Sequence, residues 1–137
     1  MINTRFSVAV HILALSASVP REQLTSEYIA GSVNTNPVVI RRIGSMLKKA
    51  GLLDSQAGIR GFALTRQPEA ITLLDIYQAV QKEEEALFAV HPSPNPDCPV
   101  GKNIQGALDT AFTNAQEAME RELADLSLKN IMNDLFS

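Results

Sequence analysis

The segment TSEYIAGSVNTNPVVIRRIGSMLKKAGLLDSQAGIRGFALT, residues Thr25–Thr65, decides the fold that we predict for this chain. It contains a short helix that Thr25 can cap, a polar turn, and a second helix with Asn36 as a good N-cap and Pro37 as a favourable first residue. Gly51 can adopt the left-handed conformation that ends a helix, and two short apolar runs follow it. This order of elements predicts a winged helix-turn-helix.

The second helix of this segment has one apolar side and one polar side. Ile40, Ile43 and Leu47 recur at helical spacing and are expected to face the core. In a major groove, the first turns of such a helix reach base edges while its flanks contact phosphates. The pattern therefore predicts a DNA-reading helix whose outer face carries Val38, Arg41, Arg42, Ser45, Lys48 and Lys49.

Two short strands are expected after this helix, at Leu52–Ser55 and Phe62–Leu64. The loop that joins them contains Gln56 and, between Gly58 and Gly61, Arg60, so it can form a hairpin. An isolated hairpin of this kind is usually a plain surface turn with a solvated arginine. Directly after a DNA-reading helix, the hairpin is better interpreted as a wing.

The N-terminal region is predicted to form a first helix that Asn3 or Thr4 can cap and that ends near Ser18. Its apolar run Val8–Leu15 loosely imitates a signal peptide, but the run is short and apolar residues recur at helical spacing. An amphipathic helix is therefore the better interpretation. The sequence contains no run near the roughly 18 apolar residues that a membrane span needs, so we expect no membrane partner and a cytoplasmic protein.

The charges are divided unequally along the chain, although the whole carries a net charge of only −3. Residues 1–66 contain eight Lys and Arg against three Asp and Glu, a net charge of +5. The remaining residues contain four bases against twelve acids, a net charge of −8. This split predicts that the N-terminal half meets a polyanion and that the C-terminal half does not.

We predict three regions: a DNA-binding domain over 1–82, a proline-rich loop over 83–101, and dimerisation and C-terminal helices over 102–137. The first region includes a helix over 71–82, capped near Glu69. From Lys102, apolar residues step at threes and fours for more than twenty residues. Such a long, narrow stripe favours packing between two subunits, and a helix folded back on its own domain is the alternative.

Cys98 is the single cysteine, which excludes an intrachain disulfide and suits a reducing cytosol. It lies in the proline-rich loop with His91 and Asp97. Cys98, with His91 nearby, is a candidate redox or effector site. A thiol that merely packs at the start of the long helix, or a small ligand bound between loop and helix, are alternatives. No metal site is predicted.

The whole chain resembles the winged-helix transcription regulators of the IscR, NsrR and CymR type, the Rrf-two family. The resemblance rests on the first helix with Arg5 and Phe6, LTSEYIA, LKKAGLLDS before the glycine-turned wing, ITLLDIYQAV, a loop with a cysteine, and a long helix. It implies a homodimer that binds double-stranded DNA at a palindromic operator and usually represses transcription. The implied DNA contacts come from Thr35, Asn36, Val38, Arg41 and Arg42, from Gln56 and Arg60 in the wing, and from Asn3, Thr4 and Arg5.

Two departures from the family pattern concern the loop and the wing. Members with an iron–sulfur cluster have three cysteines in this loop, whereas the chain has Cys98 alone, and one thiolate cannot replace the set. We therefore predict no cofactor. The wing is also leaner. Members with a fuller wing often have an arginine before the first glycine and a Gly-Gly pair before the aromatic residue, whereas here Ala57 precedes Gly58 and Gly61 alone precedes Phe62.

Two other classes of function are alternatives to a DNA-binding regulator. A protein-interaction module could keep the winged fold and dock partners through the acidic half and the long helix. An enzyme is disfavoured, because the chain has no phosphate-binding glycine loop and no paired nucleophile and base.

Overall fold

The computed structural model describes residues 4–55, 61–82 and 87–137, so Asn3, Gln56 and Arg60 lie outside the described residues. The chain divides into two compact units, Met1–Gln81 with Leu123–Ser137, and Lys82–Glu122. The three regions expected from the sequence remain a prediction.

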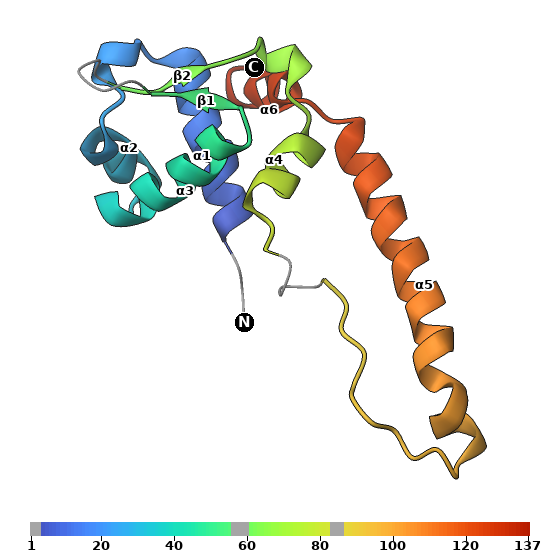
Figure 1. Ribbon diagram of the computed structural model, residues 1–137. Helices are drawn as coiled ribbons and strands as arrows, with labels where there is room; N and C mark the ends of the chain where they lie inside the picture. Colours follow the sequence, from blue (N-terminus) through green and yellow to red (C-terminus); the bar gives the residue numbers. More distant parts are fainter. Residues whose placement is uncertain (1–3, 56–60, 83–86) are drawn as a thin grey trace. The chain divides into compact units, whose positions relative to one another are not determined.

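In the first unit, α1 runs through the middle and contacts each of the other α-helices around it (Figure 1). Two short 3-10 helices lie between the longer elements, η1 before α2 and η2 before α4. The bounds are α1 Arg5–Ser18, η1 Arg21–Gln23, α2 Ser26–Val33, α3 Pro37–Lys49, η2 Pro68–Ala70, α4 Leu73–Val80 and α6 Leu128–Leu135.

The core of this unit is formed by aliphatic side chains from all five helices and from the segments between them. Burying each such side chain contributes about 1.5–3 kcal/mol relative to leaving it in water. The buried residues of α1 are Ala9, Ile12, Leu13 and Ala14, while Phe6 and Val10 only pack against the edge of the core. The largest fully buried side chains are Ile12, Leu13, Leu24, Ile29, Ile40, Ile43, Leu47, Leu52, Ile71, Ile76 and Leu128.

A two-stranded antiparallel sheet follows α3, formed by β1 Leu53–Asp54 and β2 Ala63–Leu64. Leu53 pairs with Leu64, and the buried side chain of Leu53 ties the sheet to the core. The strands are shorter than the runs predicted from the sequence, although the Thr65 N–H still donates to the Leu52 carbonyl at 3.3 Å. The sheet is therefore a short wing anchored at its base.

Helix α4 begins later than predicted, at Leu73 rather than at Ile71, and its cap is Thr72 rather than a residue near Glu69. Thr72 and Asp75 form a capping box, in which each side chain accepts a hydrogen bond from the other's backbone N–H. The prediction was wrong here because Ile71 fills the core ahead of the helix, where it is completely buried.

The C-terminal helix α6 is fastened to this same unit beside the start of α4. The Leu73 N–H donates to the Leu126 carbonyl, and the Leu128 N–H donates to the Ile71 carbonyl, both at 2.8 Å. Leu128 is fully buried. These contacts attach α6 to the winged unit, although the sequence prediction grouped it with the long helix.

The second unit contains most of α5, Pro99–Ala124, a helix of 26 residues. It begins three residues before the predicted start, because the first turn of a helix tolerates proline and its missing N–H. None of the 26 residues of α5 is buried. Among the described residues, no helix is long and apolar enough to cross a membrane.

Candidate nucleic-acid interface

The turn before α3 is built by side-chain caps and one left-handed residue. Thr25 caps α2 by accepting a hydrogen bond from the Tyr28 N–H at 3.1 Å. At the other end of α2, Asn34 adopts φ 67°, a conformation that asparagine tolerates better than most residues. The N–H groups of Asn34 and Thr35 both donate to the Ala30 carbonyl, at 2.8 and 3.0 Å. The chain therefore reverses direction over two residues.

Helix α3 starts as the sequence predicts. The Asn36 side chain accepts a hydrogen bond from the Val39 N–H at 3.1 Å, and Pro37 occupies the first turn. The helix ends in basic residues, and Gly51 follows with φ 80°. Because the cap fixes where α3 begins, it also fixes which side chains face outward.

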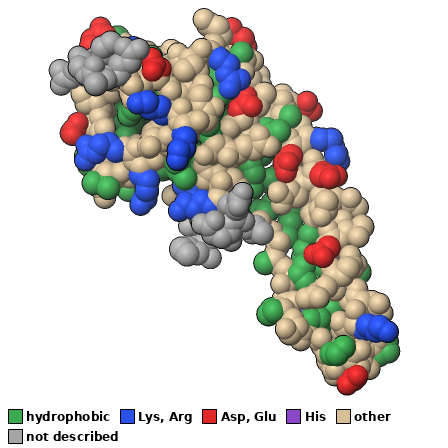
Figure 2. Space-filling model, viewed as in Figure 1, with side chains coloured by type: hydrophobic (Ala, Val, Ile, Leu, Met, Phe, Trp, Pro, Cys, Tyr) green, Lys and Arg blue, Asp and Glu red, His purple; other side chains and the backbone are tan. Residues whose placement is uncertain are grey.

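The outward face of α3 is basic and solvent-exposed. Ile40, Ile43, Gly44 and Leu47 are buried on the opposite side, while Val38 is 61% exposed. Figure 2 shows Lys and Arg side chains gathered over the region where α2 and α3 lie in Figure 1. The exposed polar residues of α3 are Arg41, Arg42, Ser45, Lys48 and Lys49.

One acidic side chain reaches this basic face. Glu27, in the first turn of α2, pairs with Arg41, with Oε1 and Nη1 3.6 Å apart. Sequence spacing does not predict this pair, because Glu27 and Arg41 are far apart along the chain. Their contact depends on how α2 and α3 pack.

The base of the wing is packed against η1. Gly61 has φ 88°, and a Cβ atom at this position would lie 1.8 Å from the Arg21 carbonyl oxygen. Glycine is therefore required both by the backbone conformation and by the lack of space. The wing residues Gln56 and Arg60, predicted to contact DNA, lie outside the described residues.

The predicted contacts at the chain start have different environments. Thr4 is exposed and sits at the N-cap position of α1, but its side chain makes no capping hydrogen bond. Arg5 is half-buried, and its Nε donates to the Val80 carbonyl at 2.7 Å. Arg5 therefore joins the start of α1 to the end of α4. Asn3 lies outside the described residues.

Cys98 lies directly before α5 and is exposed as a free thiol. The N–H groups of Gly101 and Val100 donate to its sulfur, and these hydrogen bonds hold the pKa of the thiol below its usual value. Space behind this turn is limited, because a Cβ at Gly101 would lie 2.5 Å from the Asn95 carbonyl oxygen. The local geometry favours the thiolate form.

The rest of the proline-rich loop contacts α5. Gln105 donates to the His91 carbonyl at 3.2 Å, and the rings of Phe88 and Phe112 stack with centroids 5.2 Å apart. The sequence does not predict this aromatic pair, because Phe88 precedes the prolines and belongs to no helical or strand pattern. Within the described part of the chain, no three His, Cys, Asp or Glu side chains come together as a metal site.

The capped turn, the exposed basic helix and the short wing define a winged helix-turn-helix DNA-binding protein. Comparison with known families gives a more specific assignment. Residues 2–134 match the model of the Rrf2 family, described as an iron-dependent transcriptional regulator. The chain belongs to the Rrf2 family.

Relatives and solved structures agree with this assignment. The chain is 59% identical over 136 residues to the "Putative HTH-type transcriptional regulator YwnA" of Bacillus subtilis (strain 168), covering 99% of this chain and 100% of the relative. It is similar, with a TM-score of 0.78 and 52% identity, to the "Crystal structure of a putative DNA binding protein", covering 93% and 98% of the two chains. The global cysteine regulator CymR of B. subtilis, 22% identical with a TM-score of 0.68 and 97% and 96% coverage, shares the fold.

These comparisons confirm the winged-helix fold and the family resemblance predicted from the sequence. They identify the chain as a DNA-binding transcriptional regulator and favour this class over an enzyme or a module that does not bind DNA.

The family description implies iron, and the residues of this chain do not fit an iron–sulfur cluster. Such clusters are held mainly by several cysteine thiolates. The whole sequence contains one cysteine, Cys98. The neighbouring His91 and Asp97 do not form a metal-holding group with it in the part of the chain that the structure describes.

Proposed function

We propose that this regulator is a cytoplasmic homodimer that binds a palindromic operator and represses transcription. The observation that supports this most directly is the exposed basic face of α3, fixed in place by the Asn34 turn and the Asn36 cap. A basic helix presented in this way fits the major groove of DNA. Two copies related by a twofold axis read two half-sites of opposite orientation, about one helical turn apart.

The proposed contacts fall into three groups. Thr35, Asn36, Val38, Arg41 and Arg42 face the major groove from the start of α3. Gln56 and Arg60 supply wing contacts near the minor groove, and Asn3, Thr4 and Arg5 form the contact with the DNA backbone. The hydrogen bond from Arg5 Nε to the Val80 carbonyl holds the start of α1 in place for this contact.

Dimerisation is assigned to α5. The side chains of Ile104, Leu108, Phe112, Met119 and Leu123 recur along one side of this helix, and each is only half-buried. An apolar stripe of this length needs a covering partner, and a second α5 offers a matching surface. This arrangement would also hold two winged units in a fixed relation on one duplex.

The proposed regulator works without an iron–sulfur cluster, and the loop before α5 is its signal-receiving region. Cys98 is the candidate sensor, because a thiolate stabilised by two backbone N–H groups reacts with a hydroperoxide. In that step the sulfur displaces the alkoxide or hydroxide from the peroxide and becomes a sulfenic acid. His91 lies in the same region, where its carbonyl binds Gln105 of α5.

Selection of operators from random double-stranded DNA tests this proposal. We expect an inverted repeat and salt-dependent binding, because each Lys or Arg that contacts a phosphate releases a counterion. Light scattering on the same sample should give the mass of a dimer. A reporter with the selected operator across its promoter should be repressed. Absence of DNA binding at low salt would contradict the proposal.

A further inference from the structure

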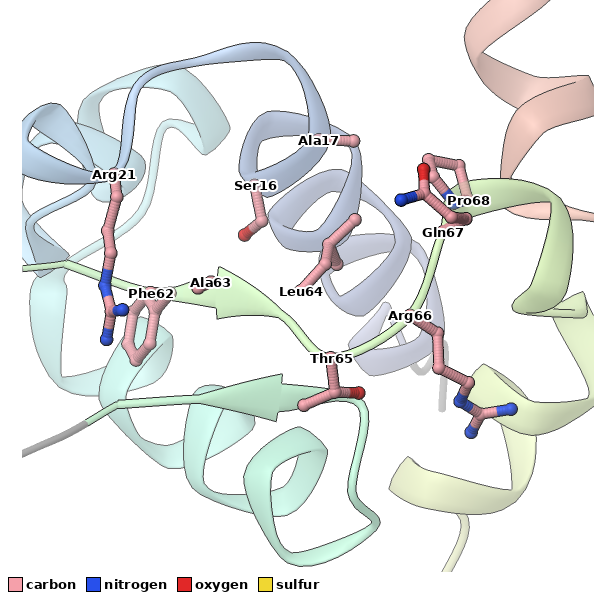
Figure 3. Close-up of a pocket in the computed structure, with 10 residues that line it drawn as sticks. All are labelled: Ser16, Ala17, Arg21, Phe62, Ala63, Leu64, Thr65, Arg66, Gln67 and Pro68. Carbon is pink, nitrogen blue, oxygen red and sulfur yellow. The ribbon is translucent and has the colours of Figure 1, made fainter.

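A polar pocket of about 540 Å³ lies in the winged unit, between the last turn of α1, η1 and the segment that runs from β2 to η2. Figure 3 shows that its walls come from these three places. The volume is within the range of roughly 300–1,000 Å³ that is typical of small-molecule sites. Its lining side chains include Ser16, Ala17, Arg21, Phe62, Leu64 and Arg66.

Arg21 is the residue of this pocket that most needs a partner. Its Nε and Nη2 atoms are buried and make no hydrogen bond. Buried charged groups are normally paired, because an uncompensated charge away from water is costly. The same two nitrogens form one edge of the guanidinium fork that binds a carboxylate in bidentate fashion. Because both atoms are shielded from solvent, an anion would satisfy them once the guanidinium turns toward the pocket.

The lining of the pocket favours an anion with an apolar body. Among the described lining residues there are two arginines and no Asp or Glu. Arg66 is partly neutralised, because its Nη1 lies 3.6 Å from Asp75 Oδ2 and 3.3 Å from the Ala70 carbonyl. Arg21 forms no ion pair among the described residues. Ala17, Phe62 and Leu64 supply an apolar wall for the rest of the ligand.

The pocket is connected to the DNA-reading helix through Phe62. Figure 3 shows the guanidinium of Arg21 beside the ring of Phe62. The same ring packs against α3 at Gly44, where a Cβ atom would lie 3.2 Å from Phe62 Cζ. Gly61, the residue before Phe62, lies against the backbone of Arg21, where a Cβ atom would meet the Arg21 carbonyl. We therefore expect a ligand that turns the guanidinium toward the pocket to shift the Phe62 ring, which touches α3.

We propose that this pocket binds a small organic carboxylate, with Arg21 as the anion-binding residue, and that its occupancy changes operator affinity through Phe62 and Gly44. The proposed carboxylate binding depends on the pocket alone. The proposed effect on operator affinity rests on the proposed function.

Binding is tested first, without DNA, on the full chain. Benzoate is the probe, benzamide is its uncharged match, and inorganic phosphate is an anion without an apolar body. We expect benzoate to shift the Nε–Hε nuclear magnetic resonance signal of Arg21 saturably and to raise the melting temperature. Benzamide should do neither, and phosphate should bind at least tenfold more weakly.

Two variants place the binding in this pocket. Arg21→Met keeps the length of the side chain and should abolish the benzoate effect, while the matched change Arg121→Gln on α5 should leave it intact. Ala17→Leu fills the apolar wall without changing Arg21, and it should also weaken benzoate binding if Arg21→Met fails to fold. Unchanged benzoate binding in a folded Arg21→Met protein, or phosphate binding as tightly as benzoate, would overturn the proposal.

Coupling is tested by titrating the selected operator with and without saturating benzoate. We expect a change in operator affinity of threefold or more in the native chain and none in Arg21→Met. An operator affinity that benzoate binding leaves unchanged would overturn the coupling. If benzoate binds but the chain recognises no operator, the pocket stands and the proposed function fails. If the chain binds an operator but not benzoate, the proposed function stands and the pocket proposal fails.

Discussion

Arg41 of α3 and Glu27 of α2 form an ion pair with Nη1 and Oε1 3.6 Å apart, and their side chains are 56% and 71% exposed. A pair this exposed contributes at most about 1 kcal/mol to stability. Its position matters more than its strength, because it places a carboxylate beside the helix proposed to enter the major groove. In the proposed complex, Glu27 would therefore compete with DNA phosphate for Arg41.

Replacing this carboxylate should strengthen DNA binding. We predict that Glu27→Gln tightens binding to operator and non-specific DNA alike by about fivefold, since it removes repulsion of about 1 kcal/mol from phosphate and releases Arg41. Fluorescence anisotropy at several salt concentrations measures the change. Glu22→Gln in η1 is the matched control. Weaker operator binding in Glu27→Gln would instead show that the pair holds Arg41 in its reading position.

Replacing each arginine of α3 should show whether its side chain reads a base or contacts a phosphate. Arg41→Ala or Arg42→Ala is predicted to cost about 1–3 kcal/mol in operator affinity if the side chain reads a base, with relaxed specificity at one position. A side chain that contacts phosphate should lower the salt slope by about one and weaken all sequences equally. Operator titrations over a salt series separate the outcomes. As a control, Arg121→Ala, which replaces an exposed arginine of α5, should change neither the operator affinity nor the salt slope.

The glycine at the base of the wing should be indispensable. Gly61→Ala is predicted to lower the free energy of unfolding by about 1–3 kcal/mol, because φ 88° is strained for alanine and its Cβ would meet the Arg21 carbonyl at 1.8 Å. Gly31→Ala is the matched control in the interior of α2, with nothing within 4 Å of the new Cβ. It should stabilise the protein by up to about 1 kcal/mol. Urea denaturation measures both, and equal effects would contradict the packing of Gly61 on η1.

Much of the winged unit could be predicted because its signals are local. Asn36, Pro37 and Gly51 mark the ends of α3 through caps and backbone conformations that depend on adjacent residues. The start of α4 could not be placed in this way, since whether Ile71 belongs to the helix or fills the core depends on Leu128, distant in sequence.

In the candidate site, too, local sequence patterns predict some residues, and others depend on the packing of distant elements. The outward residues of α3 follow from its helical period, so Arg41 and Arg42 could be assigned to the exposed face from sequence alone. The Glu27–Arg41 pair and the buried, unpaired Arg21 arise from the packing of separate elements and leave no sequence pattern.

The proposed dimer makes a direct prediction about α5. Leu108 lies midway along the half-buried stripe, and Leu108→Glu should place a charge in the interface and dissociate the dimer. Light scattering should then report a monomer, and operator affinity should fall steeply while circular dichroism stays helical. Asp109→Ala, at the neighbouring exposed position, should leave the dimer intact. A dimer that persists in Leu108→Glu would move the interface away from this stripe.

The chemistry of Cys98 should depend on the backbone that holds it. The N–H groups of Gly101 and Val100 lower the pKa of the Cys98 thiol, so its thiolate forms at a lower pH than in an unfolded chain. In an unfolded chain a cysteine titrates at about 8.5. The rate of alkylation by iodoacetamide should therefore reach half its maximum at a lower pH in the folded protein than in urea. Val100→Pro removes one donor at a position where the first turn tolerates proline, and it should move the folded midpoint back upward. Identical midpoints in folded and unfolded protein would show that the start of α5 does not stabilise the thiolate.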